Sequence, residues 1–247
     1  YRFAPDGNTI EQIFYNSKGA LDRKSFFKYN INGKRIKITF FRSTGSVIAE
    51  WTFKYDNNGN EIEASLNNSD NQSIARWISK YDKRGNRIEL FLYKSGGIFN
   101  GKNIYKYNRK GEIIESVFYN ANGSLNYKWL HKYDGNGNMC EIIWYRTGNL
   151  IHSKHIYKYD NNRNIIEISK YNASGRLYDK NIFKYENRNL VERSELNIDG
   201  TPLFKITYKY DFNGNKIEET RYEYIEQYSV KKTVITGLEI SEYIYYN

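Results

Sequence analysis

The sequence predicts an all-β protein built from tandem β-hairpin repeats, and three observations lead to this fold class. A Lys-Tyr dipeptide recurs at a spacing of 26 residues along most of the 247-residue chain. Each period carries two turn signals, separated by segments of about seven residues in which apolar and polar side chains alternate. The composition includes 17% aromatic residues but only 2 Pro, and aromatic side chains favour pleated surfaces. We therefore expect strands and tight turns.

The repeat unit contains two different turns. The first reads D-x-x-G-N, as in Asp56 to Asn60, and the second reads Y-N-x-x-G, as in Tyr119 to Gly123. Gly and Asn are typical of such turns because they tolerate a positive φ. Nine copies of the first turn predict about eighteen strands in a long antiparallel meander. Such a sheet is expected to be curved or superhelical, or to close into a shell.

Two segments are predicted along the chain. Residues 1–226 form an array of about nine hairpin repeats without a linker, since no change of composition divides them. Residues 227–247 abandon the repeat but keep a composition typical of strands. Because the end of a repeat array needs a different outer face, we expect the second segment to form capping strands.

Pairing across the first turn sorts the side chains onto two faces. In one hairpin, Tyr55 is predicted opposite Ile62 and Lys54 opposite Glu63, with alternation fixing the rest. One face then collects the repeat Tyr, Ile and other aromatic residues, and we expect it to be the core face. The other collects the recurring Lys opposite a recurring Glu. Such cross-strand ion pairs contribute roughly 0.2–1 kcal/mol each.

A second basic column accounts for much of the formal net charge of +10. It lies opposite an aromatic column in the same register, which predicts cation–π pairs across the strands. The one acidic departure, Glu50, faces Asn67, where the aromatic residue is also missing. These columns supply the candidate ligand contacts: Arg76, Tyr93, Lys102, Tyr119, Lys128, Tyr145, Lys154 and Tyr171. A purely structural role for the same pairs remains an alternative.

Catalytic, metal and cofactor sites are not predicted. The single Cys140 excludes an internal disulfide and a thiolate zinc site. In the D-x-x-G-N turn the Gly comes too early for a calcium loop, so the Asp is expected to cap its own turn. Every recurring Glu is paired with a basic residue, whereas glycoside hydrolysis needs one distinctive pair of carboxylates. We therefore expect a protein that is not an enzyme and binds no cofactor.

The repeat resembles the YD repeat of the RHS family. The resemblance rests on Y-K-Y-D-x-x-G-N, as at Tyr208 to Asn215, and on a second G-x-L turn, as at Gly123 to Leu125. It is also somewhat similar to the MORN-like repeats of bacterial antitoxin-type proteins. The RHS resemblance implies a bacterial protein, extracellular, periplasmic or at the cell surface, whose hairpins form a long curved sheet that contacts carbohydrate or protein.

Three hypotheses for function remain open. The first is a non-enzymatic secreted or cell-surface protein that contacts a glycan or protein partner through its aromatic and basic columns. The second is a structural shell or spacer in a larger RHS-like toxin, surface or secretion assembly, and the third is a polyanion-binding protein. Since much of the Lys excess is paired, the charge does not favour nucleic acid. No run approaches the roughly 20 apolar residues of a transmembrane helix.

Overall fold

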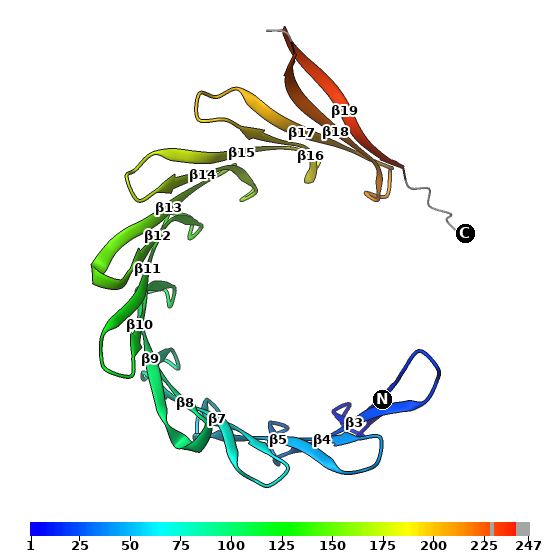
Figure 1. Ribbon diagram of the computed structural model, residues 1–247, viewed down its shortest axis with the longest axis vertical. Helices are drawn as coiled ribbons and strands as arrows, with labels where there is room; N and C mark the ends of the chain where they lie inside the picture. Colours follow the sequence, from blue (N-terminus) through cyan, green and yellow to red (C-terminus); the bar gives the residue numbers. More distant parts are fainter. Residues whose placement is uncertain (228–229, 241–247) are drawn as a thin grey trace. The chain divides into compact units, whose positions relative to one another are not determined.

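The computed structural model describes residues 1–227 and 230–240, and its regular elements are almost all strands. Contacts divide the chain into two compact units, Tyr1–Tyr127 and Lys128–Asn247. Within each unit the strands pair antiparallel with their neighbours in sequence and lie side by side in chain order (Figure 1). The described residues contain nineteen strands, so the predicted all-β meander of hairpins is confirmed.

The strands of the first unit follow one another without crossing. They are β1 (Arg2–Phe3), β2 (Thr9–Tyr15), β3 (Leu21–Tyr29), β4 (Arg35–Arg42), β5 (Val47–Tyr55), β6 (Glu61–Asn68), β7 (Ser73–Tyr81), β8 (Arg87–Lys94), β9 (Phe99–Tyr107) and β10 (Ile113–Asn120). A short 3-10 turn, η1 (Ser95–Gly97), joins β8 to β9.

The second unit continues the same pattern. Its strands are β11 (Leu125–Tyr133), whose first residues belong to the first unit, β12 (Met139–Arg146), β13 (Leu150–Tyr159), β14 (Ile165–Asn172), β15 (Leu177–Glu186), β16 (Asn189–Leu196), β17 (Pro202–Tyr210), β18 (Lys216–Gln227) and β19 (Val230–Ile240). A second 3-10 turn, η2 (Thr147–Asn149), joins β12 to β13. The strands β18 and β19 pair as an antiparallel hairpin. The assignment of residues 227–247 as capping strands stays a prediction, and 228–229 and 241–247 lie outside the described residues.

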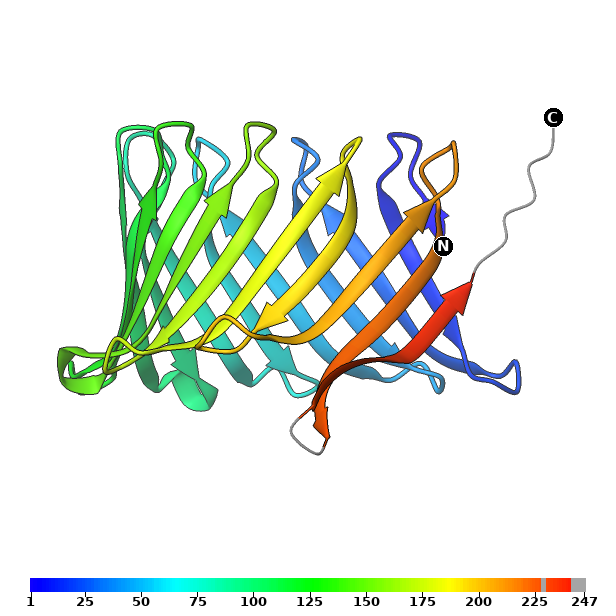
Figure 2. The ribbon, with the colours of Figure 1, turned by 90° about the horizontal axis from the view of Figure 1, so that it is seen from above.

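The two kinds of turn lie at opposite ends of the strands in each unit (Figure 2). In the first kind, the Asp56 carboxylate accepts hydrogen bonds from the backbone N–H and side-chain amide of Asn60, at 2.8 and 2.9 Å. These bonds, the side-chain one first, hold the pKa of Asp56 below its ordinary value. Gly59 supplies the positive φ of +81° that closes the turn. The prediction that the Asp caps its own turn is confirmed.

A β-bulge follows each such turn and changes the register at its first pair. Lys54 lies opposite Glu63, as predicted, but Tyr55 lies opposite Glu61. The prediction that Tyr55 faces Ile62 is therefore wrong. The left-handed Gly inserts one extra residue on one strand, and Ile62 is the residue left without a partner in the ladder.

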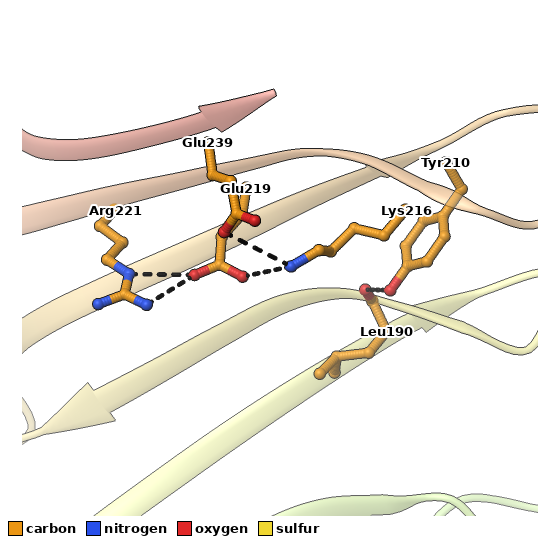
Figure 3. Close-up of polar contacts among 6 residues, drawn as sticks. All are labelled: Leu190, Tyr210, Lys216, Glu219, Arg221 and Glu239. Atoms are coloured by element: carbon orange, nitrogen blue, oxygen red, sulfur yellow. Dashed lines mark hydrogen bonds and ion pairs between the residues drawn. The ribbon is translucent and has the colours of Figure 1, made fainter. Parts of the chain in front are cut away.

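The recurring Tyr joins successive repeats through its hydroxyl. Six of these hydroxyls donate to a backbone carbonyl 20 residues earlier, just after the first turn of the preceding repeat; the bond from Tyr210 to Leu190 appears in Figure 3. The bonds are Tyr29 to Thr9 (2.9 Å), Tyr55 to Arg35 (2.8 Å), Tyr81 to Glu61 (2.8 Å), Tyr107 to Arg87 (2.7 Å), Tyr159 to Met139 (2.8 Å) and Tyr210 to Leu190 (2.9 Å). We call these bonds tyrosine staples. They give the repeat a reason to keep Tyr where Phe would pack equally well.

Burial is shared between the two faces of the sheet. The buried apolar side chains among the described residues are Ile38, Ala64 and Val117. Ile38 lies opposite Phe27 on the predicted core face. Val117 lies two residues after Glu115 on the same strand, so the two share the charged face. The predicted core face thus holds only part of the buried side chains. In a single layer, long side chains on both faces cover the backbone and the small residues between them.

Candidate functional site: the basic–aromatic face

Four of the recurring Glu residues each lie between two cations. We name the face that carries them the basic–aromatic face; it holds the Lys of each Lys-Tyr pair, the Glu column, and the second basic column with its aromatic partners. In the first unit, Glu89 lies 2.8 Å from Lys80 and 3.5 Å from Lys102. In the second unit, Glu141 lies 2.6 Å from Lys132 and 3.5 Å from Lys154.

Two further trios have the same arrangement. Glu63 pairs with Lys54 and Arg76 in the first unit, and Glu167 pairs with Lys158 and Lys180 in the second. The sequence predicts only one cation for each Glu. The second basic column therefore reaches both toward the aromatic column and toward the carboxylate. Two cations and one anion leave each trio with a net charge of +1.

In each trio the carboxylate is less exposed to solvent than the two cations beside it. The side chain of Lys80 is 59% exposed, whereas that of Glu89 is 22% exposed. The hydrogen bond from Lys80, together with the charges of both Lys residues, outweighs burial and holds the pKa of Glu89 below its ordinary value. At Glu141 burial raises the pKa, but Lys132 and Lys154 outweigh it and the pKa is again lowered. All four carboxylates are therefore ionised at neutral pH.

One repeat carries the same charges in exchanged positions. Lys37 replaces the Glu of its column and Glu50 replaces the second basic residue, and the two form an ion pair at 2.5 Å. Lys28 lies opposite Lys37, and Glu50 lies opposite Asn67 as predicted. The two departures in the sequence are thus one compensated exchange, and this repeat also keeps a net charge of +1.

The predicted cation–π pairs form at three of the four positions. Arg76 lies 6.0 Å from the ring centroid of Tyr93, Lys128 4.4 Å from that of Tyr145, and Lys154 5.7 Å from that of Tyr171. The role of all eight candidate residues as ligand contacts stays a prediction.

Lys102 departs from this pattern. It lies opposite Tyr119 in the register, as predicted, but its ammonium group lies over the ring of Phe91, 5.7 Å from the centroid. The predicted stacking of Lys102 on Tyr119 is therefore wrong. Phe91 gives the physical reason: it lies directly opposite Lys102 on β8, whereas Ile143 lies opposite Lys154, so Lys102 finds a second ring on the side of Glu89.

A hollow of about 280 Å³ lies beside Lys102 and Tyr119 in the first unit. Phe99 lines it as well, although strict alternation assigns Phe99 to the other face. A bulge between Leu92 and Tyr93 pairs Tyr93 with Phe99, and the two ring centroids are 5.5 Å apart. The doublet of Gly in η1 was the signal in the sequence for an irregular turn here. The hollow is lined by Phe99, Lys102, Ile104, Tyr119, Asn120, Ala121 and Gly123.

Polar side chains also gather on the opposite face in the second unit. Glu219 accepts hydrogen bonds from Lys216 at 2.8 Å and from two nitrogens of Arg221 at 2.9 and 3.0 Å, and these lower its pKa (Figure 3). Lys170 pairs with Asp179 at 2.5 Å on the same face. The predicted core face therefore becomes polar toward the C-terminus. A hollow of about 520 Å³ nearby is lined by Arg193, Leu203, Phe204, Ile206, Arg221, Tyr222, Glu223, Tyr224 and Thr236.

Groups that could hold a metal ion were sought across the described ranges 1–227 and 230–240. No cluster of three or more His, Cys, Asp or Glu side chains occurs there. In the same part of the chain, no helix has the length and apolar character needed to cross a membrane. Two of the His residues have other neighbours: His152 packs edge-on against Trp144, and His155 lies opposite Lys170.

Comparisons with known proteins identify no family. No family model and no curated protein matches the chain. Among solved structures, TcdB2-TccC3 without its hypervariable C-terminal region is 13% identical, with a TM-score of 0.39 over 92% of this chain and 14% of that chain. The Photorhabdus luminescens Tc holotoxin pore is 10% identical, with a TM-score of 0.34 over 91% of this chain and 15% of that chain. A porin-like protein from Bacteroides uniformis is 10% identical, with a TM-score of 0.39 over 83% of this chain and 91% of that chain.

The chain thus spans about a seventh of the length of the toxin chains that it matches. At these identities and TM-scores, the likenesses decide neither the family nor the function of the chain. The resemblance of its repeat to the RHS family stays a prediction from sequence.

Proposed function

We propose that the chain is a non-enzymatic binding protein that contacts a glycan or a protein partner through the basic–aromatic face, in a secreted or cell-surface setting. The observation that carries the proposal is the composition of this face, which repeats an unneutralised cation beside an aromatic ring in both units. Aromatic side chains and Arg are enriched at protein interfaces, and a cation beside an aromatic ring presents both a charge and an apolar surface to a ligand.

The setting rests on the resemblance to the RHS family, which implies a bacterial secreted or surface protein. The non-enzymatic assignment rests on the regularity of the face. Its carboxylates are all ion-paired and repeat in every trio, so no pair of them differs from the others as a catalytic acid and base would.

The test removes the face residues one unit at a time. Lys102→Gln with Tyr119→Ala alters the first unit, and Lys128→Gln with Tyr145→Ala alters the second. Lys83→Gln with Lys110→Gln is the control, because it removes two charges from exposed turns, one more than either face variant removes. Binding is measured on a glycan array and by capture of partner proteins, with the urea midpoint of each variant as the measure of folding.

We expect both face variants to lose at least tenfold in affinity while the control keeps its affinity. Equal binding by the face variants and the control, with all of them folded, would refute the proposal. A spacer or shell without a ligand of its own would bind nothing on the array or in the capture experiment, and this result would equally count against it.

A further inference from the structure

The spacing of charge on the basic–aromatic face suits a polymer that carries few negative charges. Within each unit, successive trios are one repeat apart, and a repeat contributes two strands. At about 4.8 Å between neighbouring strands, the net charges of +1 are spaced about 10 Å apart. The Glu63 and Glu89 trios of the first unit, and the Glu141 and Glu167 trios of the second, have this relation.

A nucleic acid carries charge too densely for this face. Each strand of a DNA duplex has one phosphate per roughly 3.4 Å, hence about three phosphates in the length of one repeat. Each repeat offers one unneutralised cation in that length, so two phosphates of every three would face no cation. The charges match a linear polymer with one anionic group per about 10 Å.

The two ion pairs of each trio allow one cation to bind a ligand while the other remains paired with the Glu. If Lys102 turns to an anion, Lys80 still lies 2.8 Å from Glu89 and neutralises it. Binding therefore leaves no carboxylate half-buried and unpaired, which is the usual cost of breaking an ion pair. A face with one Lys for each Glu would not have this property.

The surroundings of Lys102 add features that favour a sugar. The hollow beside it places a cation next to the rings of Phe99 and Tyr119 and the polar side chain of Asn120. Hollows lined by aromatic rings with a few fixed polar groups are typical of sites for small organic rings. A carboxylate on Lys102 would leave its own sugar ring beside Tyr119.

From these observations we infer that the ligand is an acidic polysaccharide with one carboxylate per disaccharide. The inference rests on the proposed function and names the class of ligand for the same face.

Its test uses hyaluronan oligosaccharides, the same oligosaccharides with their carboxylates reduced to alcohols, and oligothymidylate of similar length as probes. Affinities are measured by titration calorimetry at low and moderate salt, for the unaltered chain, for Lys102→Gln with Tyr119→Ala, and for the Lys83→Gln with Lys110→Gln control.

We expect hyaluronan to bind at least tenfold more tightly than its reduced form and than oligothymidylate, and to lose at least tenfold in affinity in the face variant only. Equal binding of the reduced form, still lost in the face variant, would overturn the inference and leave the proposed function standing. Tighter binding of oligothymidylate, or no binding of hyaluronan, would also overturn it. Equal binding by the face variant and the control would refute the proposed function as well.

Discussion

The tyrosine staples make a stability prediction that can be worked out from single hydrogen bonds. Replacing Tyr81 with Phe keeps the ring in place and removes the hydroxyl that donates to the Glu61 carbonyl at 2.8 Å and accepts longer bonds from Arg87 at 3.2 and 3.4 Å. A hydrogen bond of this kind contributes about 0.5–1.5 kcal/mol. We therefore expect Tyr81→Phe to lower the free energy of unfolding by about 1 kcal/mol.

The first unit carries four such staples, from Tyr29, Tyr55, Tyr81 and Tyr107. Successive staples are one repeat, or about 10 Å, apart, and substitutions at that distance act almost additively. Replacing all four Tyr with Phe should cost roughly 4 kcal/mol. This is a large share of the 5–15 kcal/mol that stabilises a typical domain.

The assay is equilibrium unfolding in urea, and Tyr93→Phe is the matched control. Tyr93 belongs to the same unit, but within the described residues its hydroxyl makes no hydrogen bond, so its loss should change the free energy of unfolding by less than about 0.5 kcal/mol. If Tyr81→Phe shifts the unfolding midpoint no more than Tyr93→Phe does, the reasoning about the staples is refuted.

Three further predictions concern the turns and the charges. Arg163 holds a φ of +67° where other repeats have Gly, so Arg163→Gly should raise the free energy of unfolding by about 1 kcal/mol. Arg109→Gly, in a turn position without positive φ, should give no such gain. If Arg163→Gly gives no gain either, the role assigned to backbone strain is contradicted. Lys37→Glu or Glu50→Lys alone should destabilise the chain, and the double exchange should recover about 0.5–1 kcal/mol in a double-mutant cycle, with simple additivity as the contrary result. Because the pKa of Glu89 and its counterparts is lowered on folding, their stabilisation is present above the ordinary Glu pKa of about 4.3 and is lost as the pH falls through the folded pKa; urea midpoints from pH 7 to pH 3 should fall, and Glu89→Gln should reduce that fall.

The repeat and most of its register can be predicted from sequence because both depend on neighbours in a hairpin. Alternation and the five-residue turn are enough to place Lys54 opposite Glu63 and Glu50 opposite Asn67. The same reasoning misses the bulge that pairs Tyr55 with Glu61, because an alternating pattern gives no sign of an extra residue next to the turn.

The candidate site is less predictable because its contacts extend beyond one hairpin. The second cation of each trio comes from the following hairpin, as Lys102 does for Glu89, and the cross-strand register within a hairpin does not include that contact. The ring of Phe91, opposite Lys102 on the preceding strand, then holds its ammonium group away from Tyr119, the predicted aromatic partner. The hydroxyl of each stapling Tyr likewise acts on the preceding repeat, so its pattern shows only that Tyr recurs.

The staples connect the repeats at the end of the strands that carries the D-x-x-G-N turns. The residues of the turns at the other end are therefore free to vary. The turn of residues 68–72 and the 3-10 turns η1 and η2 all lie at the end of the strands that carries the Y-N-x-x-G turns, where no staple forms among the described residues. The turn at 68–72 and η1 differ from the regular turns in their residues but not in their length, because Asn68 donates to the Gln72 carbonyl and Lys94 to that of Ile98, as Asn120 does to that of Ser124. The residues of these turns can therefore be exchanged without disturbing the spacing of the strands. Sequence diversity between related chains should accumulate at this margin.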